Sequence, residues 1–142
     1  LLESTAFGTR EIIEAFTKNG VAVDSIVAAG GLPDRNPLLM QIFADATNRE
    51  YRVIRSALGG ALGSAMHGAV AAGEAAGGYV DIFAAEKKMG GLKDVVYRPN
   101  PANVKLYDQL YADYSTLYSY FGRGENDVMK RLRAMRRSAL AE

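Results

Sequence analysis

The sequence predicts an α/β fold in which short parallel strands are joined by crossover helices. Two short apolar runs, at residues 21–29 and 51–54, have the length of buried strands. Apolar residues recur at helical spacing before, between and after these runs. Because a helical segment separates the two strands, we expect them to lie parallel in one sheet.

The first predicted helix starts with the chain and ends near residue 19, ahead of Gly20. Its predicted buried face consists of Leu2, Ala6, Phe7, Ile12, Ile13 and Phe16. No capping residue or initiator methionine precedes this periodicity. We therefore expect a piece of a longer protein, in which further strands of the sheet lie upstream of Leu1.

A glycine turn follows the first predicted strand. Gly30 and Gly31 lack the Cβ atom that holds a ligand away from the main chain. Asn36 can cap a second helix and Pro37 can begin it. The predicted buried face of this helix consists of Leu39, Ile42, Phe43 and Ala46. The turn matches neither a P-loop nor the three-glycine dinucleotide motif, so a nucleotide-binding backbone and a purely structural turn both stay open.

Small residues dominate the third predicted helix, at residues 57–72. We expect this helix to press closely against the sheet, with packing as the role of its glycine cluster, Gly59, Gly60 and Gly63. Asp81 is predicted to cap a short helix, and residues 90–99 are predicted to form a surface loop.

Two helices are predicted to end the chain. Asn100 and Pro101 give the long helix a cap-and-proline start. One face of that helix carries the tyrosines Tyr107, Tyr111, Tyr114 and Tyr118. We expect this stripe to lie in the core or an interface rather than to stack on sugars or bases. The last helix, at residues 125–141, is basic and amphipathic, and we expect it to face solvent or another subunit.

Composition excludes several classes of function. The 142 residues carry a formal net charge of +1, so no global field attracts nucleic acid. The chain has no cysteine, which excludes disulfides and thiolate metal sites and is compatible with the cytoplasm. No apolar run is long enough for a membrane span. We therefore expect neither nucleic acid nor a membrane among the partners.

Side chains with catalytic chemistry are few. Ser64 and His67 lack the spacing of a nucleophile elbow, and the only histidine has no second histidine for a metal site. Asp34, Asp45 and Glu50 flank the first glycine turn, where an acid or base can be imagined. We expect Asp34 to organise the turn and Asp45 to face solvent on its helix.

A longer pattern is more specific than the glycines alone. Residues 28–45, followed by residues 61–66, resemble the C-terminal nucleotide-binding domain of the FGGY carbohydrate kinases. The flanking segments are similar to the branch of this family that phosphorylates L-ribulose, and they comprise residues 3–10, 97–99, 120–124 and 126–132. The resemblance covers essentially the whole chain.

The resemblance implies a fold, namely part of an actin-like, ribonuclease-H-like ATPase domain. Residues 1–142 are then the C-terminal part of the second, nucleotide-binding domain of such a kinase. Within it we expect residues 1–75 to form an α-β-α-β-α nucleotide-binding core, and residues 76–142 to form a helical C-terminal extension.

The resemblance also implies a cofactor site for ATP. Gly30 and Gly31 are implied to lie against its ribose and α-phosphate, and Asn36 to reach its adenine. Arg35 is the alternative adenine contact, because the loop differs in length by one residue among family members. Residues 57–60 depart from the family, which usually has a polar residue before its Ala-Leu-Gly helix start, so we expect no adenine contact there.

The implied reaction transfers the γ-phosphoryl group of ATP to the terminal hydroxyl of L-ribulose, with magnesium as a further cofactor. The family's catalytic aspartate, its N-terminal phosphate loops and most of its sugar pocket have no counterpart in these residues. We therefore assign no catalytic residue and no metal ligand here, and we expect the chain alone to transfer no phosphate.

Rival functions stay open. Another FGGY kinase, acting on xylulose, gluconate or glycerol, is the nearest. A non-catalytic assembly module would use the tyrosine stripe and the basic helix, with the glycines purely structural. A dinucleotide oxidoreductase is disfavoured by the glycine spacing. The sequence also leaves the oligomeric state open, with a homo-oligomer among the alternatives.

Overall fold

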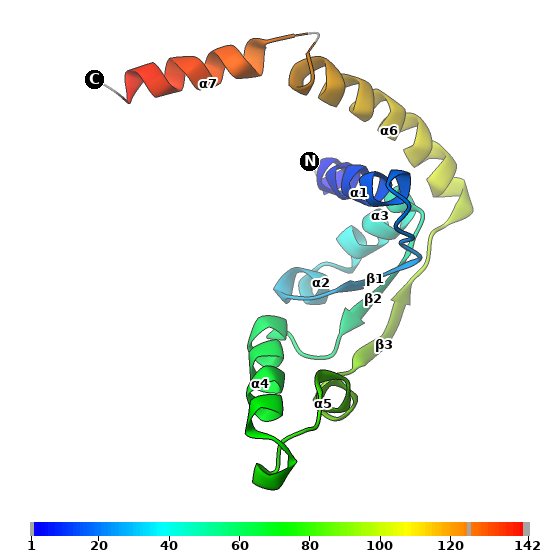
Figure 1. Ribbon diagram of the computed structural model, residues 1–142. Helices are drawn as coiled ribbons and strands as arrows, with labels where there is room; N and C mark the ends of the chain where they lie inside the picture. Colours follow the sequence, from blue (N-terminus) through cyan, green and yellow to red (C-terminus); the bar gives the residue numbers. More distant parts are fainter. Residues whose placement is uncertain (1, 125, 141–142) are drawn as a thin grey trace.

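The chain folds into a small mixed sheet with helices on one face and beyond its ends (Figure 1). The structure is a computed structural model, and it describes residues 2–124 and 126–140. In chain order, the elements are α1 (Leu2–Lys18), β1 (Ser25–Ala28), α2 (Gly31–Arg35), α3 (Pro37–Thr47), β2 (Glu50–Ile54), α4 (Gly59–Ala72), the 3₁₀ helix η1 (Glu74–Ala76), α5 (Ile82–Met89), β3 (Leu92–Tyr97), α6 (Pro101–Gly122) and α7 (Val128–Ala139).

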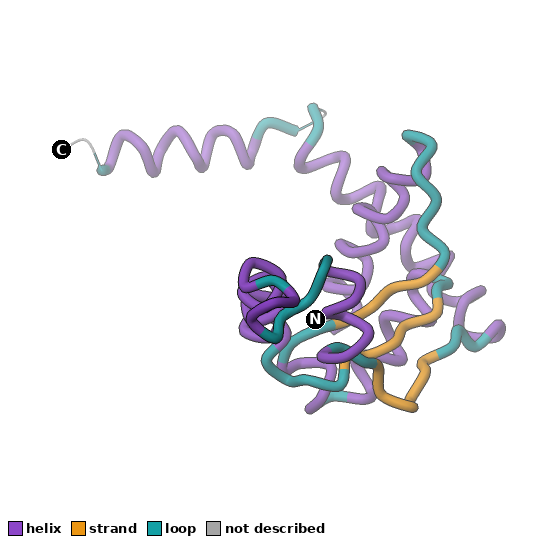
Figure 2. Tube along the Cα trace, turned by 60° about the horizontal axis from the view of Figure 1, so that its bottom comes forward, coloured by secondary structure: helices purple, strands orange, loops and turns teal. Residues whose placement is uncertain are grey.

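The sheet has the strand order β1-β2-β3 in the described residues, and Figure 2 shows its strands in orange. β1 and β2 are parallel, in register from Ser25 opposite Glu50 to Ala28 opposite Val53, which confirms the predicted parallel pair. β3 runs antiparallel to β2. Since antiparallel strands run in opposite directions, β3 begins at the edge of the sheet where β1 and β2 end.

The prediction of a surface loop at residues 90–99 is wrong, because β3 occupies most of this segment. Val95, Val96 and Tyr97 favour an extended chain, and the backbone groups of β2 give that chain a pairing partner. The part of the chain beyond residue 75 is therefore not helical throughout, while the division after residue 75 stays a prediction.

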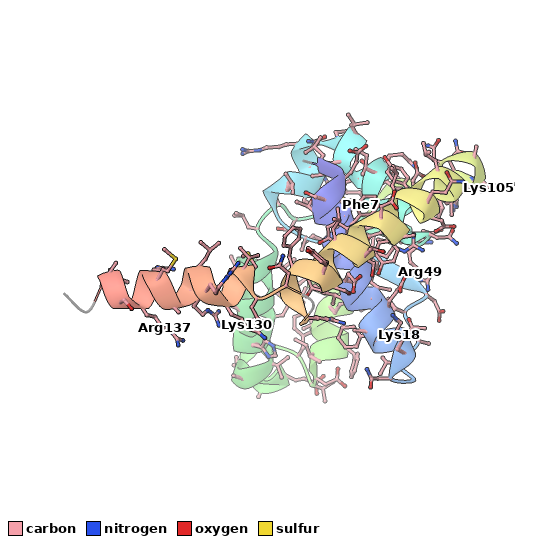
Figure 3. The ribbon with its side chains drawn as sticks, turned by 90° about the horizontal axis from the view of Figure 1, so that it is seen from above. Phe7, Lys18, Arg49, Lys105, Lys130 and Arg137 are labelled. Atoms are coloured by element: carbon pink, nitrogen blue, oxygen red, sulfur yellow. The ribbon has the colours of Figure 1, made fainter. Side chains whose placement is uncertain are left out.

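A helical layer covers one face of the sheet. Its core is a cluster in which α1, α3 and α6 meet. The buried members of this cluster are Ala6, Phe7, Ala46 and Tyr111, and the half-buried side chains packed on them are Ile42, Phe43, Tyr107 and Tyr114. The ring of Phe7 lies 5.4 Å from that of Tyr114 and 6.0 Å from that of Tyr111, where α1 passes α6 (Figure 3). The predicted core role of the tyrosine stripe is thus confirmed up to Tyr114, whereas Tyr118 is exposed.

Two predicted packing faces need correction. In α1, Ala6, Phe7 and Ile13 are buried, but the predicted partners Leu2, Ile12 and Phe16 are exposed. The helix at residues 57–72 was expected to press on the sheet, yet α4 packs mainly against α5 beyond the sheet's end (Figure 1). Its first residue, Gly59, approaches the sheet, and Met66 is its one buried side chain among the described residues. The small side chains of α4 offer too little apolar area to hold it flat on the sheet.

The C-terminal helices leave the body of the molecule. α6 rests on α1 and α3 as far as Tyr114, and α7 projects away, with Lys130 and Arg137 exposed along it (Figure 3). The expected solvent exposure of this basic helix is confirmed for α7, and the predicted ends of the helix at Glu125 and Ala141 lie outside the described residues. Among residues 2–124 and 126–140, no helix combines the length and apolar character needed to cross a membrane.

Candidate functional site

The predicted site residues gather at one edge of the sheet. β1 and β2 both end there, and the chain leaves β1 through Gly30 and Gly31. The sequence predicted a direct passage from the glycine turn to the capped helix. Instead, the five residues of α2 stand between them, and they end where Asn36 leaves helical geometry with φ −137°. Pro33, which is buried, anchors α2 to the body of the protein.

The main chain at Gly30 and Gly31 is open. Gly30 has φ +99°, a conformation that side chains with a Cβ rarely adopt. A methyl group built on either glycine would meet no other atom within 4 Å. Because packing does not require the absence of a side chain here, the open space is compatible with the close approach of a ligand to the backbone.

Asn36 joins α2 to α3. Its backbone N–H donates to the carbonyl of Leu32 at 3.1 Å, and its side-chain Oδ1 accepts from the N–H of Leu39 at 3.0 Å. The predicted cap is therefore confirmed, and Pro37 follows it as the first residue of α3. Since Oδ1 is engaged, Nδ2 is the group of this side chain that can donate to a ligand. Arg35, at the end of α2, is exposed.

Asp34 was expected to organise its own turn, and its side chain contacts a lysine far along the chain. Its Oδ1 accepts from Nζ of Lys93 at 2.6 Å, which ties α2 to the start of β3. Both side chains are largely shielded, with exposed fractions of 19% for Asp34 and 36% for Lys93. The sequence did not point to Lys93, because it lies 59 residues away in a segment that was expected to be a loop.

The expectation that Asp45 faces solvent is wrong. Asp45 is only 3% exposed and accepts three hydrogen bonds, each of 2.8 Å, which come from Nε2 of Gln41, the backbone N–H of Asn100 and Nδ2 of Asn103. A buried carboxylate is tolerated when its lone pairs are satisfied in this way. Asp45 therefore fastens the beginning of α6 to α3 and is a structural residue.

Glu50 is not brought to the glycine turn. It pairs with Ser25 at the opposite end of β1, away from Gly30. Nε of Arg52 donates to its Oε1 at 2.8 Å, and this hydrogen bond holds the pKa of Glu50 below its usual value. Lowering the pKa favours the carboxylate form and makes a poorer general base.

The second glycine cluster differs from the first at Gly59, which is packed. A methyl group on Gly59 would lie 2.7 Å from Cδ1 of Ile54 and 3.3 Å from Cβ of Ala29. The predicted packing role is confirmed for Gly59, whereas Gly60 and Gly63 face open space. A mainly apolar hollow of about 330 Å³ adjoins Gly59 and reaches Val27 and Met66.

Comparison with known proteins identifies the relatives of this chain. Residues 1–72 match the FGGY family of carbohydrate kinases, C-terminal domain. The chain is 55% identical to a ribulokinase from Geobacillus thermodenitrificans over 141 residues, which are 99% of this chain and 25% of the relative. It is 57% identical to a ribulokinase from Halalkalibacterium halodurans over 136 residues, which are 96% of this chain and 24% of the relative. The chain thus spans about a quarter of the length of the curated relatives it matches.

A solved structure shares the fold. The crystal structure of xylulose kinase from Rhodospirillum rubrum matches with a TM-score of 0.65 and 30% sequence identity, over 84% of this chain and 23% of that one. The mixed α/β architecture, the match to residues 1–72 and the similarity to ribulokinases agree. The chain belongs to the FGGY family of carbohydrate kinases and holds residues of its C-terminal domain.

Proposed function

We propose that this chain forms the adenosine-binding part of an ATP-dependent kinase that phosphorylates L-ribulose. The observation that carries the proposal is the open main chain at Gly30 and Gly31, which leads through α2 to the half-buried side chain of Asn36. A ligand that follows this path meets backbone first and an amide donor second. A nucleotide offers a polar ribose–phosphate chain followed by a base with acceptor nitrogens, in that order.

Three residues of the proposed site have the space or the chemistry that ATP requires. A methyl group at position 31 would occupy free space, so a ligand can lie against the main chain there. Nδ2 of Asn36 can donate to a ring nitrogen of adenine while Oδ1 keeps its bond to Leu39. Arg35, exposed at the end of α2, is the second candidate for the adenine contact.

The contribution of this chain to catalysis is positioning. When bound, ATP supplies the γ-phosphoryl group, which passes in line to a terminal sugar hydroxyl. When adenosine is held at a fixed place, part of the entropy lost in bringing ATP and sugar together is lost on binding and not in the transfer step. The described residues bring together no group of three or more His, Cys, Asp or Glu side chains that could hold a metal ion. We propose no magnesium ligand among them.

The open glycine gives the sharpest test of the proposed site. In the full-length enzyme, Gly31→Ala is expected to leave thermal stability unchanged and to raise the KM for ATP roughly tenfold, because the methyl group occupies the ligand's space. Gly68→Ala is the matched control, since Gly68 lies in α4 and also has no neighbour within 4 Å. An unchanged ATP KM in Gly31→Ala would contradict the proposed site.

The adenine contact is tested separately. Asn36→Ser keeps a side-chain oxygen to cap Leu39 but removes the Nδ2 donor, so it separates capping from ligand binding. We expect weaker ATP binding without a loss of stability, and Arg35→Ala decides whether the neighbouring side chain makes the contact instead. Calorimetric titration of both variants with ATP distinguishes the two assignments.

The acceptor sugar is proposed from the relatives. Proteins named ribulokinase are 55% and 57% identical to this chain, against 30% for the xylulose kinase. A panel of ribulose, xylulose, gluconate and glycerol with the full-length enzyme is expected to give the highest kcat/KM for L-ribulose. The chain alone is expected to show no ATP turnover with any of them. Location in the cytoplasm and assembly into a homo-oligomer stay predictions.

A further inference from the structure

One ion pair near the proposed site is not explained by the packing of the core. Asp34 and Lys93 come from α2 and β3, which do not otherwise share a sheet pairing or a helix face. At 2.6 Å between Nζ and Oδ1, their contact is the shortest ion pair in the described part of the chain. The segment it holds is the one that carries Gly30, Gly31 and Asn36.

The position of Lys93 follows from an irregularity in β3. Arg52 of β2 pairs with Val96, but Ile54, two positions on, pairs with Leu92. β3 therefore carries extra residues between these partners, and such a bulge turns side chains away from their regular alternation. Lys93 lies within this bulge, at the edge of the sheet where β1 ends.

The ion pair connects the segment between β1 and α3 to β3. The chain leaves β1 at Ala28, and Asp34 reaches β3, which lies on the far side of β2. The segment from Gly30 to Asn36 is thus held at its start by the sheet, at Asp34 by Lys93 and at its end by the cap on Leu39. The space that a Cβ atom would occupy at Gly30 and Gly31 is empty within 4 Å.

We propose that Lys93 and Asp34 act as positioning residues for the nucleotide, by holding the α2 segment in the conformation that presents Gly30, Gly31 and Asn36 to ATP. This inference rests on the proposed function of that site. Neither residue is proposed to contact the ligand. The pair reduces the conformational freedom that ATP binding would otherwise have to remove.

The variants Asp34→Asn and Lys93→Gln each remove one charge with little change in shape. In the full-length enzyme without nucleotide, we expect faster amide hydrogen exchange across residues 29–36 in both variants. With ATP, we expect the KM for ATP to rise about two- to fivefold, as for a partly exposed ion pair, while kcat and the KM for the sugar stay unchanged. The double variant is expected to be no worse than either single variant, because both remove the same interaction.

Asp127→Asn is the matched control. It breaks another aspartate–lysine pair, Asp127 with Lys130 at 2.9 Å on α7, far from the α2 segment. It is expected to change neither the exchange of residues 29–36 nor the KM for ATP. Asp34→Glu, which keeps the charge, is expected to restore most of the ATP affinity lost in Asp34→Asn.

The outcomes separate this inference from the proposed function. If the unaltered enzyme binds ATP but the two variants leave both the exchange and the KM unchanged, the positioning role is overturned and the proposed site stands. Additive effects in the double variant would also overturn it, because they show that the two side chains act independently. If the unaltered enzyme binds no ATP, the proposed function and the inference fall together.

Discussion

The two strand–glycine–helix units of this protein look alike in sequence and differ in structure. In the first, Gly30 and Gly31 face open space, and α3, which comes after the short helix α2, is buried over much of its length. In the second, Gly59 is packed against Ile54, and the helix that follows, α4, buries one side chain among the described residues. A glycine pattern alone therefore does not distinguish a ligand site from a close helix contact, whereas the space over each Cα does.

The helix α3, which follows the open glycines and α2, is held in place by several contacts. α3 is held by Asp45 to the start of α6 and by Phe43 and Ala46 to the core cluster. A well-packed helix next to the open glycines lets ligand contacts form with less ordering of the protein. The second unit has the reverse arrangement, with a fixed glycine and a largely exposed helix.

The largest expected effect tests the support behind the first unit. Asp45→Ala removes the shared buried acceptor of three hydrogen bonds from partly buried or exposed donors, and we expect it to lower the free energy of unfolding by about 3 kcal/mol. Urea unfolding of the variant measures this loss. Asp113→Ala, at an exposed aspartate of α6, is the control. A loss below that of the control would show that α3 does not depend on this carboxylate.

The packed glycine is tested next. In Gly59→Val the first added carbon already lies 2.7 Å from Ile54 and 3.3 Å from Ala29, so the branched side chain must displace both. We expect the free energy of unfolding to fall by about 2 kcal/mol, as is typical of overpacking. Gly60→Val, one residue on and in open space, is the matched control. Equal losses in both variants would remove the distinction drawn between the two glycine clusters.

Backbone strain, not packing, limits substitution at Gly30. Its φ of +99° is unfavourable for any residue with a Cβ, although nothing lies within 4 Å. We expect Gly30→Ala to lower the free energy of unfolding by about 1–2 kcal/mol, while Gly31→Ala, without a positive φ, costs little. Thermal unfolding of the two variants side by side checks this contrast, and a similar Tm in both would refute it.

The smallest expected effect is a gain. Gly68 lies inside α4 with open space over its Cα, so Gly68→Ala is expected to raise the free energy of unfolding by about 0.5–1 kcal/mol through helix propensity. Chemical denaturation measures the gain. A loss of stability would mean that α4 needs this glycine for a close contact, and that the two helices are less different than the structure indicates.

Local chemistry predicted the first unit well and its surroundings poorly. The parallel strands, the Asn36 cap and the Pro37 start depend on neighbouring residues and were confirmed. The burial of Asp45 depends on Asn100 and Asn103, which are 55 and 58 residues away, and no periodicity reports such a contact.

The second failure of prediction has a similar origin. β3 looked like a loop because glycines precede it and a proline follows it, and only pairing with β2 makes it a strand. α2 was missed because five residues are too few for helical periodicity to appear. The open space at Gly30 and Gly31 was expected from the residue type alone, and their contact with ATP stays a prediction.

The length of the short helix α2 sets both the distance and the rotation between the glycine turn and Asn36. Each residue of a helix turns the chain by about 100°, because a turn takes about 3.6 residues. Deleting one residue between Gly31 and Asn36 would shorten the spacing and also rotate the following side chain away from its present direction. Two sequences that differ in length by one residue in this segment therefore cannot be compared by residue number alone. In the shorter or longer sequence, the proposed adenine contact would have to come from the residue next to the one that corresponds to Asn36.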